Sequence, residues 1–198
     1  LMLFRNLAIK KDAGYGIPDH DTSELFFSSI HHLHSSGTTP YTGKIQAMNL
    51  EGKVALVLGG IKGIGRLVGL ALAQAGACVA LNYYDWEEEL DTLKRDVAAT
   101  GRDHLILKTD LREVADIPLL VQAVVGRFGR LDILVNNIER GGWPVVHGPY
   151  VGEQWDLEME TTLRAKRWVF QAALPHLKAA GDGAVINLSS IAAIVGRR

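Results

Sequence analysis

The 198-residue chain has a single cysteine, almost no net charge and no long hydrophobic run. Because Cys78 has no second cysteine to pair with, an internal disulfide is excluded, and we expect a reducing compartment, the cytoplasm. No apolar stretch approaches the roughly 20 residues of a membrane span. A formal net charge of −1, with the charges interspersed, leaves no basic face for nucleic acid or a membrane surface. Small molecules are therefore the expected partners.

The first 47 residues lack any sustained hydrophobic period. Glycine, proline, serine, threonine and histidine are scattered through them. We predict that 1–47 is an N-terminal extension, mostly disordered, and that 48–198 is one domain. His31, His32 and His34 could ligate a metal, but no cysteine and only scattered acidic residues accompany them. A solvated histidine run is favoured, and no metal site is predicted.

From residue 53 onward, short apolar runs alternate with helical patterns. The runs read as near-continuous Val, Ile and Leu, which is typical of strands buried on both faces of a parallel sheet. The sequence therefore predicts an α/β fold with a doubly wound parallel sheet. The expected strands are 54–58, 78–83, 104–108, 131–135 and 184–188, and the expected helices are 64–75, 87–99, 116–128 and 153–180.

Three closely spaced glycines mark the passage from the first strand into the first turn of the first helix of this pattern. Gly59 would let the chain leave the strand sharply, and Gly63 would let the backbone approach a phosphate. Gly65 would let the new helix lie tightly on the sheet. Where a strand ends in glycines and a helix begins directly after them, the helix start presents free N–H groups and the positive end of its dipole to an anion. The alternative is a plain tight turn.

Residues 49–198 resemble the short-chain dehydrogenase/reductase family, and the glycine turn together with four further motifs carries this resemblance. The motifs are, in chain order, Gly59-x-x-x-Gly63-Ile64-Gly65, Asp110-Leu111, Asn136-Asn137, Trp155-Asp156 and Ile186-Asn187-Leu188-Ser189-Ser190. The resemblance implies a Rossmann-like sheet of strand order 3-2-1-4-5 for the portion present, with the cofactor across the carboxyl ends of the strands. It also implies an NAD(P)-dependent oxidoreductase that moves hydride between nicotinamide and a carbonyl or alcohol substrate, as a homo-oligomer in full-length form.

Ten residues are implied in cofactor binding: Gly59, Lys62, Gly63, Ile64, Gly65, Tyr83, Asp110, Leu111, Asn136 and Asn137. Asp110 can accept a hydrogen bond from an adenine amino group, whereas local chemistry alone allows a turn or N-cap role equally. Asn136 can both donate and accept, so it can fix the central strand and the backbone near the cofactor. For Asn137, structural and cofactor roles stay open.

The choice between NADP and NAD depends on the tip of the second strand. An acidic residue there normally accepts from the adenosine ribose and repels a 2′-phosphate. This position falls on Tyr83, while Lys62 stands where a cation can pair with the extra phosphate. We therefore expect NADP, with NAD possible, because Asp85 argues the other way. Arg66 could assist Lys62, although simple solvation is favoured.

Two residues are implied in catalysis, and two expected ones are absent. Ser190 matches the family's substrate-binding serine, and the asparagine of the long helix is replaced by Thr162. No Tyr-x-x-x-Lys follows Ser190 in these 198 residues, so the sequence resembles a domain truncated before that motif. Two alternatives stay open: a non-catalytic dinucleotide-binding module and an inactive truncated fragment.

Overall fold

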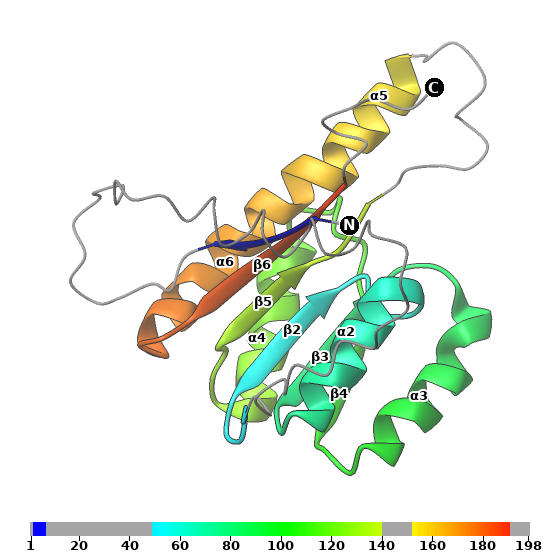
Figure 1. The fold of residues 1–198 in the computed structure, drawn as a ribbon. Coiled ribbons are helices and arrows are strands. Elements are labelled where there is room, and N and C mark those ends of the chain that lie inside the picture. Colours follow the sequence, from blue (N-terminus) through cyan, green and yellow to red (C-terminus); the bar gives the residue numbers. More distant parts are fainter. Residues whose placement is uncertain (1, 7–48, 140–151, 191–198) are drawn as a thin grey trace, which may run out of the picture. The chain divides into compact units, whose positions relative to one another are not determined.

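A computed structural model describes residues 2–6, 49–139 and 152–190. Five strands of its sheet are parallel and lie in the spatial order β4-β3-β2-β5-β6, and this confirms the predicted order 3-2-1-4-5 (Figure 1). The strands are β2 (Val54–Leu58), β3 (Cys78–Tyr83), β4 (His104–Lys108), β5 (Ile133–Asn136) and β6 (Ala184–Ser189).

Helices cover both faces of this sheet, as a doubly wound fold requires. Apolar residues of α2 (Gly63–Gln74) and α3 (Leu90–Ala99) belong to one buried cluster, and those of α4 (Asp116–Phe128) and α6 (Ala165–Ala179) belong to the other. A 3-10 turn, η1 (Glu87–Glu89), precedes α3. Within the described ranges, no helix has the length and apolar character needed to cross a bilayer.

The central strand explains why the sequence reads as an unbroken apolar run. Val54, Leu56 and Leu58 face the α4–α6 cluster, whereas Ala55 and Val57 face the α2–α3 cluster. All five are buried. Successive side chains of a strand point to opposite faces, so a strand covered on both sides has no polar position to alternate with.

A sixth strand, β1 (Met2–Asn6), pairs antiparallel with β6 at the edge of the sheet. It falls within 1–47, the segment that the sequence predicts to be mostly disordered. The backbone groups along an edge strand are open to pairing, and even a short segment can satisfy them. The remainder of the predicted extension, with His31, His32 and His34, lies outside the described residues.

The long helix predicted over 153–180 is not uniform. It consists of α5 (Gly152–Glu158), a π-helical segment η3 (Met159–Arg164) and α6. π-helical turns inside α-helices are rare and occur frequently at functional sites. Here the wider turn contains two successive β-branched residues, Thr161 and Thr162, whose side chains fit the α-helical turn less well than unbranched ones.

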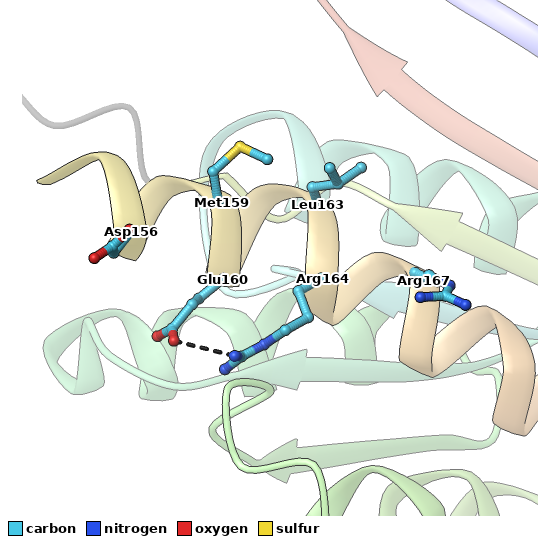
Figure 2. Close-up of a pocket in the computed structure, with 6 residues that line it drawn as sticks. All are labelled: Asp156, Met159, Glu160, Leu163, Arg164 and Arg167. Atoms are coloured by element: carbon cyan, nitrogen blue, oxygen red, sulfur yellow. Dashed lines mark ion pairs between the residues drawn. The ribbon is translucent and has the colours of Figure 1, made fainter. Parts of the chain in front are cut away.

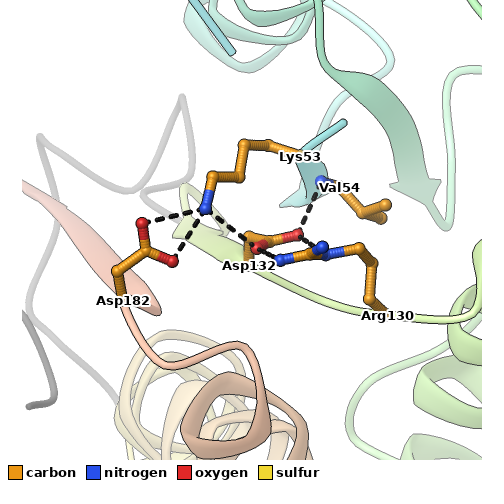
Figure 3. A network of polar contacts seen from close by, with 5 residues as sticks. All are labelled: Lys53, Val54, Arg130, Asp132 and Asp182. Atoms are coloured by element: carbon orange, nitrogen blue, oxygen red, sulfur yellow. Dashed lines mark hydrogen bonds and ion pairs between the residues drawn. The ribbon is translucent and has the colours of Figure 1, made fainter. Parts of the chain in front are cut away.

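A charged network ties the strands together at their amino ends (Figure 3). The buried carboxylate of Asp132 accepts hydrogen bonds from the Val54 N–H at 2.9 Å and from two nitrogens of Arg130 at 2.8 and 2.6 Å. Lys53 lies 3.5 Å from Asp132 and donates to the exposed Asp182 at 2.7 Å. The network links the starts of β2 and β5 to the turn before β6.

Candidate functional site

The strand register brings the predicted motifs to one edge of the sheet. Leu58, the last residue of β2, lies opposite Asn136 of β5, which in turn lies opposite Asn187 of β6. Because these strands are parallel, their carboxyl ends meet at the same edge. The glycine turn, the Asn136-Asn137 pair and Ser190, which directly follows β6, therefore share the edge where ligands bind in open α/β sheets.

The glycine turn has the backbone conformation that its sequence predicts. Gly59 and Gly63 adopt φ values of +68° and +55°, which L side chains rarely occupy. No atom lies within 4 Å of where a Cβ of Gly63 would stand, and Gly63 itself is exposed. The turn therefore presents bare backbone to solvent directly at the start of α2.

Gly65 works differently from the sequence-based expectation. A Cβ at Gly65 would stand 2.0 Å from the carbonyl oxygen of Gly59 and 2.4 Å from Nδ2 of Asn137, so the glycine is needed inside the turn itself. The close contact between α2 and the sheet is made by Gly69, whose Cβ would stand 2.5 Å from Cδ2 of Leu81. Gly65 thus preserves the shape of the turn, and Gly69 sets the packing of the helix.

The two asparagines after β5 connect this turn to its neighbours. Asn137 donates from Nδ2 to the carbonyl of Gly59 at 3.1 Å, so it has a structural role in holding the turn. Asn136 is only 2% exposed and donates to Oδ1 of Asn187 at 2.7 Å. Its own Oδ1 is buried and accepts no hydrogen bond from the described residues. Such an acceptor is costly unless a ligand or water completes it.

Sequence reasoning missed Asn82, which joins the ends of β3 and β4. Its backbone carbonyl accepts from the N–H of Gly60 at 2.8 Å, and its buried amide donates to the carbonyls of Leu107 at 3.4 Å and Thr109 at 3.3 Å. A lone asparagine inside the apolar run of the second strand was the available signal, because a buried amide needs partners. The neighbouring Tyr83 is buried against the α2–α3 cluster.

Asp110 fulfils its turn role in the structure. Its carboxylate accepts from the backbone N–H of Arg112 at 3.0 Å and from the Arg112 guanidinium, with Nε 2.9 Å from Oδ1. This guanidinium holds the pKa of Asp110 below its ordinary value. Leu111, between them, is buried in the core and not at the surface.

Lys62 and Arg66, both expected near the adenosine end, have different partners. Nζ of Lys62 lies over the ring of Trp86, 2.6 Å from its centroid. Arg66 pairs with Glu89 at 3.3 Å and with Asp96 at 2.5 Å, so it ties α2 to η1 and α3. These ion pairs differ from the simple solvation of Arg66 that the sequence favours. Ile64, in the first turn of α2, is exposed.

The predicted catalytic pair lies on two elements. Ser190 is exposed at the end of β6. Thr162 lies in η3 and donates its hydroxyl to Oε2 of Glu158 at 3.0 Å. The hydroxyl oxygen of the adjacent Thr161 is buried and has no hydrogen-bond partner within the described residues. The polar positions on the wider helical turn are thus only partly satisfied.

The hollow shown in Figure 2 is lined by no residue of the glycine turn. It has a volume of about 430 Å³, and all its lining residues come from α5, η3 and the start of α6: Asp156, Met159, Glu160, Leu163, Arg164 and Arg167. A hollow lined by a single helical run has no facing wall to enclose a ligand. It therefore adds no residue to the candidate site. The described ranges also contain no cluster of potential metal ligands.

A family model described as short chain dehydrogenase matches residues 53–198. The chain belongs to this family. Its motifs and its strand order agree with that membership, so the recognition made from the sequence is confirmed.

Among its relatives are enzymes of varied substrates. The chain is 34% identical over 146 residues to the 3-oxoacyl-[acyl-carrier-protein] reductase of Staphylococcus aureus, covering 73% of this chain and 58% of that one. It is 36% identical over 157 residues to the 2-dehydro-3-deoxy-D-gluconate 5-dehydrogenase of Escherichia coli, covering 77% and 59%. It is 37% identical over 147 residues to a hydroxynaphthalene reductase of Aspergillus fumigatus, covering 74% and 53%. The chain thus spans little more than half the length of these relatives.

Solved structures give the same fold. A metagenomic short-chain oxidoreductase in complex with NADP superposes with a TM-score of 0.65 at 32% identity, over 72% of this chain and 64% of that one. A Serratia marcescens short-chain dehydrogenase/reductase variant gives a TM-score of 0.60 at 32% identity, over 65% and 52%.

Proposed function

We propose that this chain binds NADP, in preference to NAD, as the cofactor-binding part of an oxidoreductase that acts on a carbonyl or alcohol substrate. The observation that carries the proposal is the glycine turn at the carboxyl end of β2. Gly63 presents an exposed, left-handed backbone with open space around it, at the start of a twelve-residue helix. Backbone N–H groups in that position suit a pyrophosphate.

Four further residues have a role in this proposal. The buried, unpartnered Oδ1 of Asn136 can accept a donor beside the turn. Asn137 keeps the turn in shape, and Ser190 would hydrogen-bond the substrate oxygen, with Thr162 supporting it from η3. A bound nicotinamide would supply or accept the hydride. A relative of the same fold in complex with NADP supports this assignment of the cofactor.

The preference for NADP follows from the charges around the adenosine end. Tyr83 replaces the acidic residue that would repel a 2′-phosphate, and its side chain is buried. Within the described residues, no carboxylate pairs with Lys62, so its charge is available to an anion. Asp85 is exposed and remains the one carboxylate that favours NAD.

A second candidate is a dinucleotide-binding module without turnover. One observation favours it: Thr162 stands where the family has an asparagine, and its hydroxyl is engaged by Glu158. The two candidates share the binding step and differ only in turnover.

We also propose the cytoplasm as the location and a homo-oligomer as the full-length form. The first rests on the free Cys78, whose thiol pKa is raised by burial, so it is poorly reactive. The second rests on the family alone.

The test compares two glycines of matched backbone. Gly63 and Gly101 have φ values of +55° and +68°, and neither has an atom within 4 Å of a Cβ. Alanine at either site should cost about 1 kcal/mol of stability through strain. NADPH affinity, measured by fluorescence titration, should fall tenfold or more for Gly63→Ala, because the added methyl group keeps the phosphate away from the backbone. A tenfold loss is on the order of one hydrogen bond to a charged group. Gly101→Ala should bind NADPH as tightly as the unaltered chain does.

Equal NADPH affinities of the two variants would contradict the proposal. Reduction of a carbonyl substrate by the folded chain would exclude the second candidate, the module without turnover.

A further inference from the structure

The loop that follows β3 contains a tryptophan in an unfavourable conformation. Trp86 has φ +61° and ψ +45°, and it is the only non-glycine residue with positive φ in the described part of the chain. A bulky residue in the left-handed region is an outlier that persists only where its surroundings determine it. The side chain is 47% exposed, so burial of its ring does not account for the conformation.

Two ion pairs hold this loop in place. Glu87 pairs with Lys108 at the end of β4, and Glu89 pairs with Arg66 of α2. The 3-10 turn η1 is thereby attached to both neighbouring elements. Trp86, directly before η1, is fixed beside the first turn of α2 by these contacts.

The ring of Trp86 is in contact with the ammonium group of Lys62. Nζ lies over the ring face, well inside the roughly 6 Å over which a ring attracts a cation. Lys62 is the residue that precedes α2, and its side chain makes no hydrogen bond to the end of the helix. The contact therefore holds the ammonium at the junction of the glycine turn and the tip of β3.

The nature of the partner matters for the charge of Lys62. The loop offers the carboxylates of Asp85, Glu87, Glu88 and Glu89, yet two of them are engaged by Lys108 and Arg66. A lysine paired with a carboxylate is neutralised, whereas one held by a ring keeps its full charge and its remaining N–H donors. An aromatic partner therefore positions Lys62 and leaves it able to bind an anion.

We propose that Trp86 is a positioning residue for NADP selectivity: its ring holds the Lys62 ammonium in place for the 2′-phosphate of adenosine. This rests on the proposed function. Without the ring, a free lysine side chain loses rotamer freedom only when the phosphate arrives, and affinity falls accordingly. A ligand without the 2′-phosphate does not use Lys62 and is insensitive to Trp86.

The test uses adenosine 2′,5′-bisphosphate and 5′-AMP as probes, because they differ in the 2′-phosphate and need no nicotinamide site. In calorimetric titrations of the 198-residue chain, Trp86→Leu should weaken the bisphosphate roughly three- to tenfold and change 5′-AMP less than about twofold. Trp86→Phe should retain most of the bisphosphate affinity, because a phenyl ring still attracts the cation. Trp86→Gly, which fits the left-handed backbone, should repeat the effect of leucine with the fold intact.

Two controls separate positioning from general damage. Trp155→Leu, an exposed tryptophan on α5, should leave both affinities unchanged. In a Lys62→Met background, Trp86→Leu should have no further effect on the bisphosphate, because the two residues act as a pair. In NMR spectra of the free chain, the ε-methylene protons of Lys62 should be shifted upfield by the ring, and the shift should disappear in Trp86→Leu.

Failure of the inference and failure of the proposed function are distinguishable. If the unaltered chain binds neither probe, the proposed function is overturned and the inference with it. If it binds the bisphosphate more tightly than 5′-AMP and Trp86→Leu leaves that ratio unchanged or raises it, only the inference is overturned. An equal effect of Trp86→Leu in the Lys62→Met background also overturns it.

Discussion

At the scale of single residues, buried polar groups at the two edges of the sheet differ in how fully they are satisfied. Asp132, at the amino edge, has hydrogen-bond or ion-pair partners for both of its oxygens. Asn136, at the carboxyl edge, has a buried oxygen without a partner in the described ranges. A fully paired buried group stabilises the fold, whereas an unpaired one is explained by a ligand or water that completes it. The unpaired oxygen of Asn136 therefore supports the proposal that a ligand binds at the carboxyl edge.

Replacing Asp132 with alanine should destabilise the chain by about 3 kcal/mol, because it leaves the Val54 N–H and the Arg130 guanidinium without their acceptor. Urea unfolding measures the loss. Asp182→Ala is the control, since Asp182 also pairs with Lys53 but is exposed, and its loss should be much smaller. A loss no larger for Asp132→Ala than for Asp182→Ala would show that the buried carboxylate does not hold the strands.

The limits of sequence reasoning are clearest at these residues. The sequence predicts that Gly59, Asn136 and Ser190 meet at one edge, because each follows a buried parallel strand. It does not predict the contact of Asn137 with the Gly59 carbonyl, which depends on the register of β5 against β2. Nor does it predict that Lys62 meets Trp86, because that contact depends on the left-handed backbone of a loop.

At the scale of elements, strands were predicted more closely than helices. The bounds of β2, β3 and β4 agree with the expected ranges, whereas β5 begins two residues later than expected. The π-helical η3 was not predicted, since a helical hydrophobic period does not reveal a locally wider turn. The antiparallel β1 was missed because its pairing depends on the open edge of β6, a property of the sheet and not of the segment.

The packing of α2 on β3 gives an element-scale prediction. Gly69→Ala should destabilise the chain by about 1–2 kcal/mol, because overpacking against Leu81 exceeds the gain in helix propensity. Leu81→Ala makes room, so adding Gly69→Ala to it should be neutral or stabilising. The four free energies of unfolding form a double-mutant cycle.

Gly126 is the matched control for this cycle. It lies in α4 with no atom within 4 Å of a Cβ, so Gly126→Ala should stabilise the chain by about 0.5–1 kcal/mol. If Gly69→Ala also stabilised the chain, the close approach of the helix to Leu81 would not constrain the fold.

At the scale of the whole molecule, one helical run has an apolar stripe that faces solvent. Trp168 and Phe170, both in α6, pack partly against the core. The large apolar residues exposed on α5 and η3 are Trp155, Met159 and Leu163, which are spaced four residues apart. Such spacing places side chains on one side of a helix. A contiguous exposed apolar surface favours association.

We therefore expect the chain to self-associate through this stripe. Leu163 is 59% exposed, and Leu163→Glu places a charge in the contact, which should raise the concentration for half-association about tenfold or more. Sedimentation velocity over a concentration series measures the change. Leu119, 60% exposed on α4, stands outside the stripe, and Leu119→Glu should leave association unaltered. A monomeric unaltered chain, or an equal response of the two variants, would show that the stripe is not the contact surface.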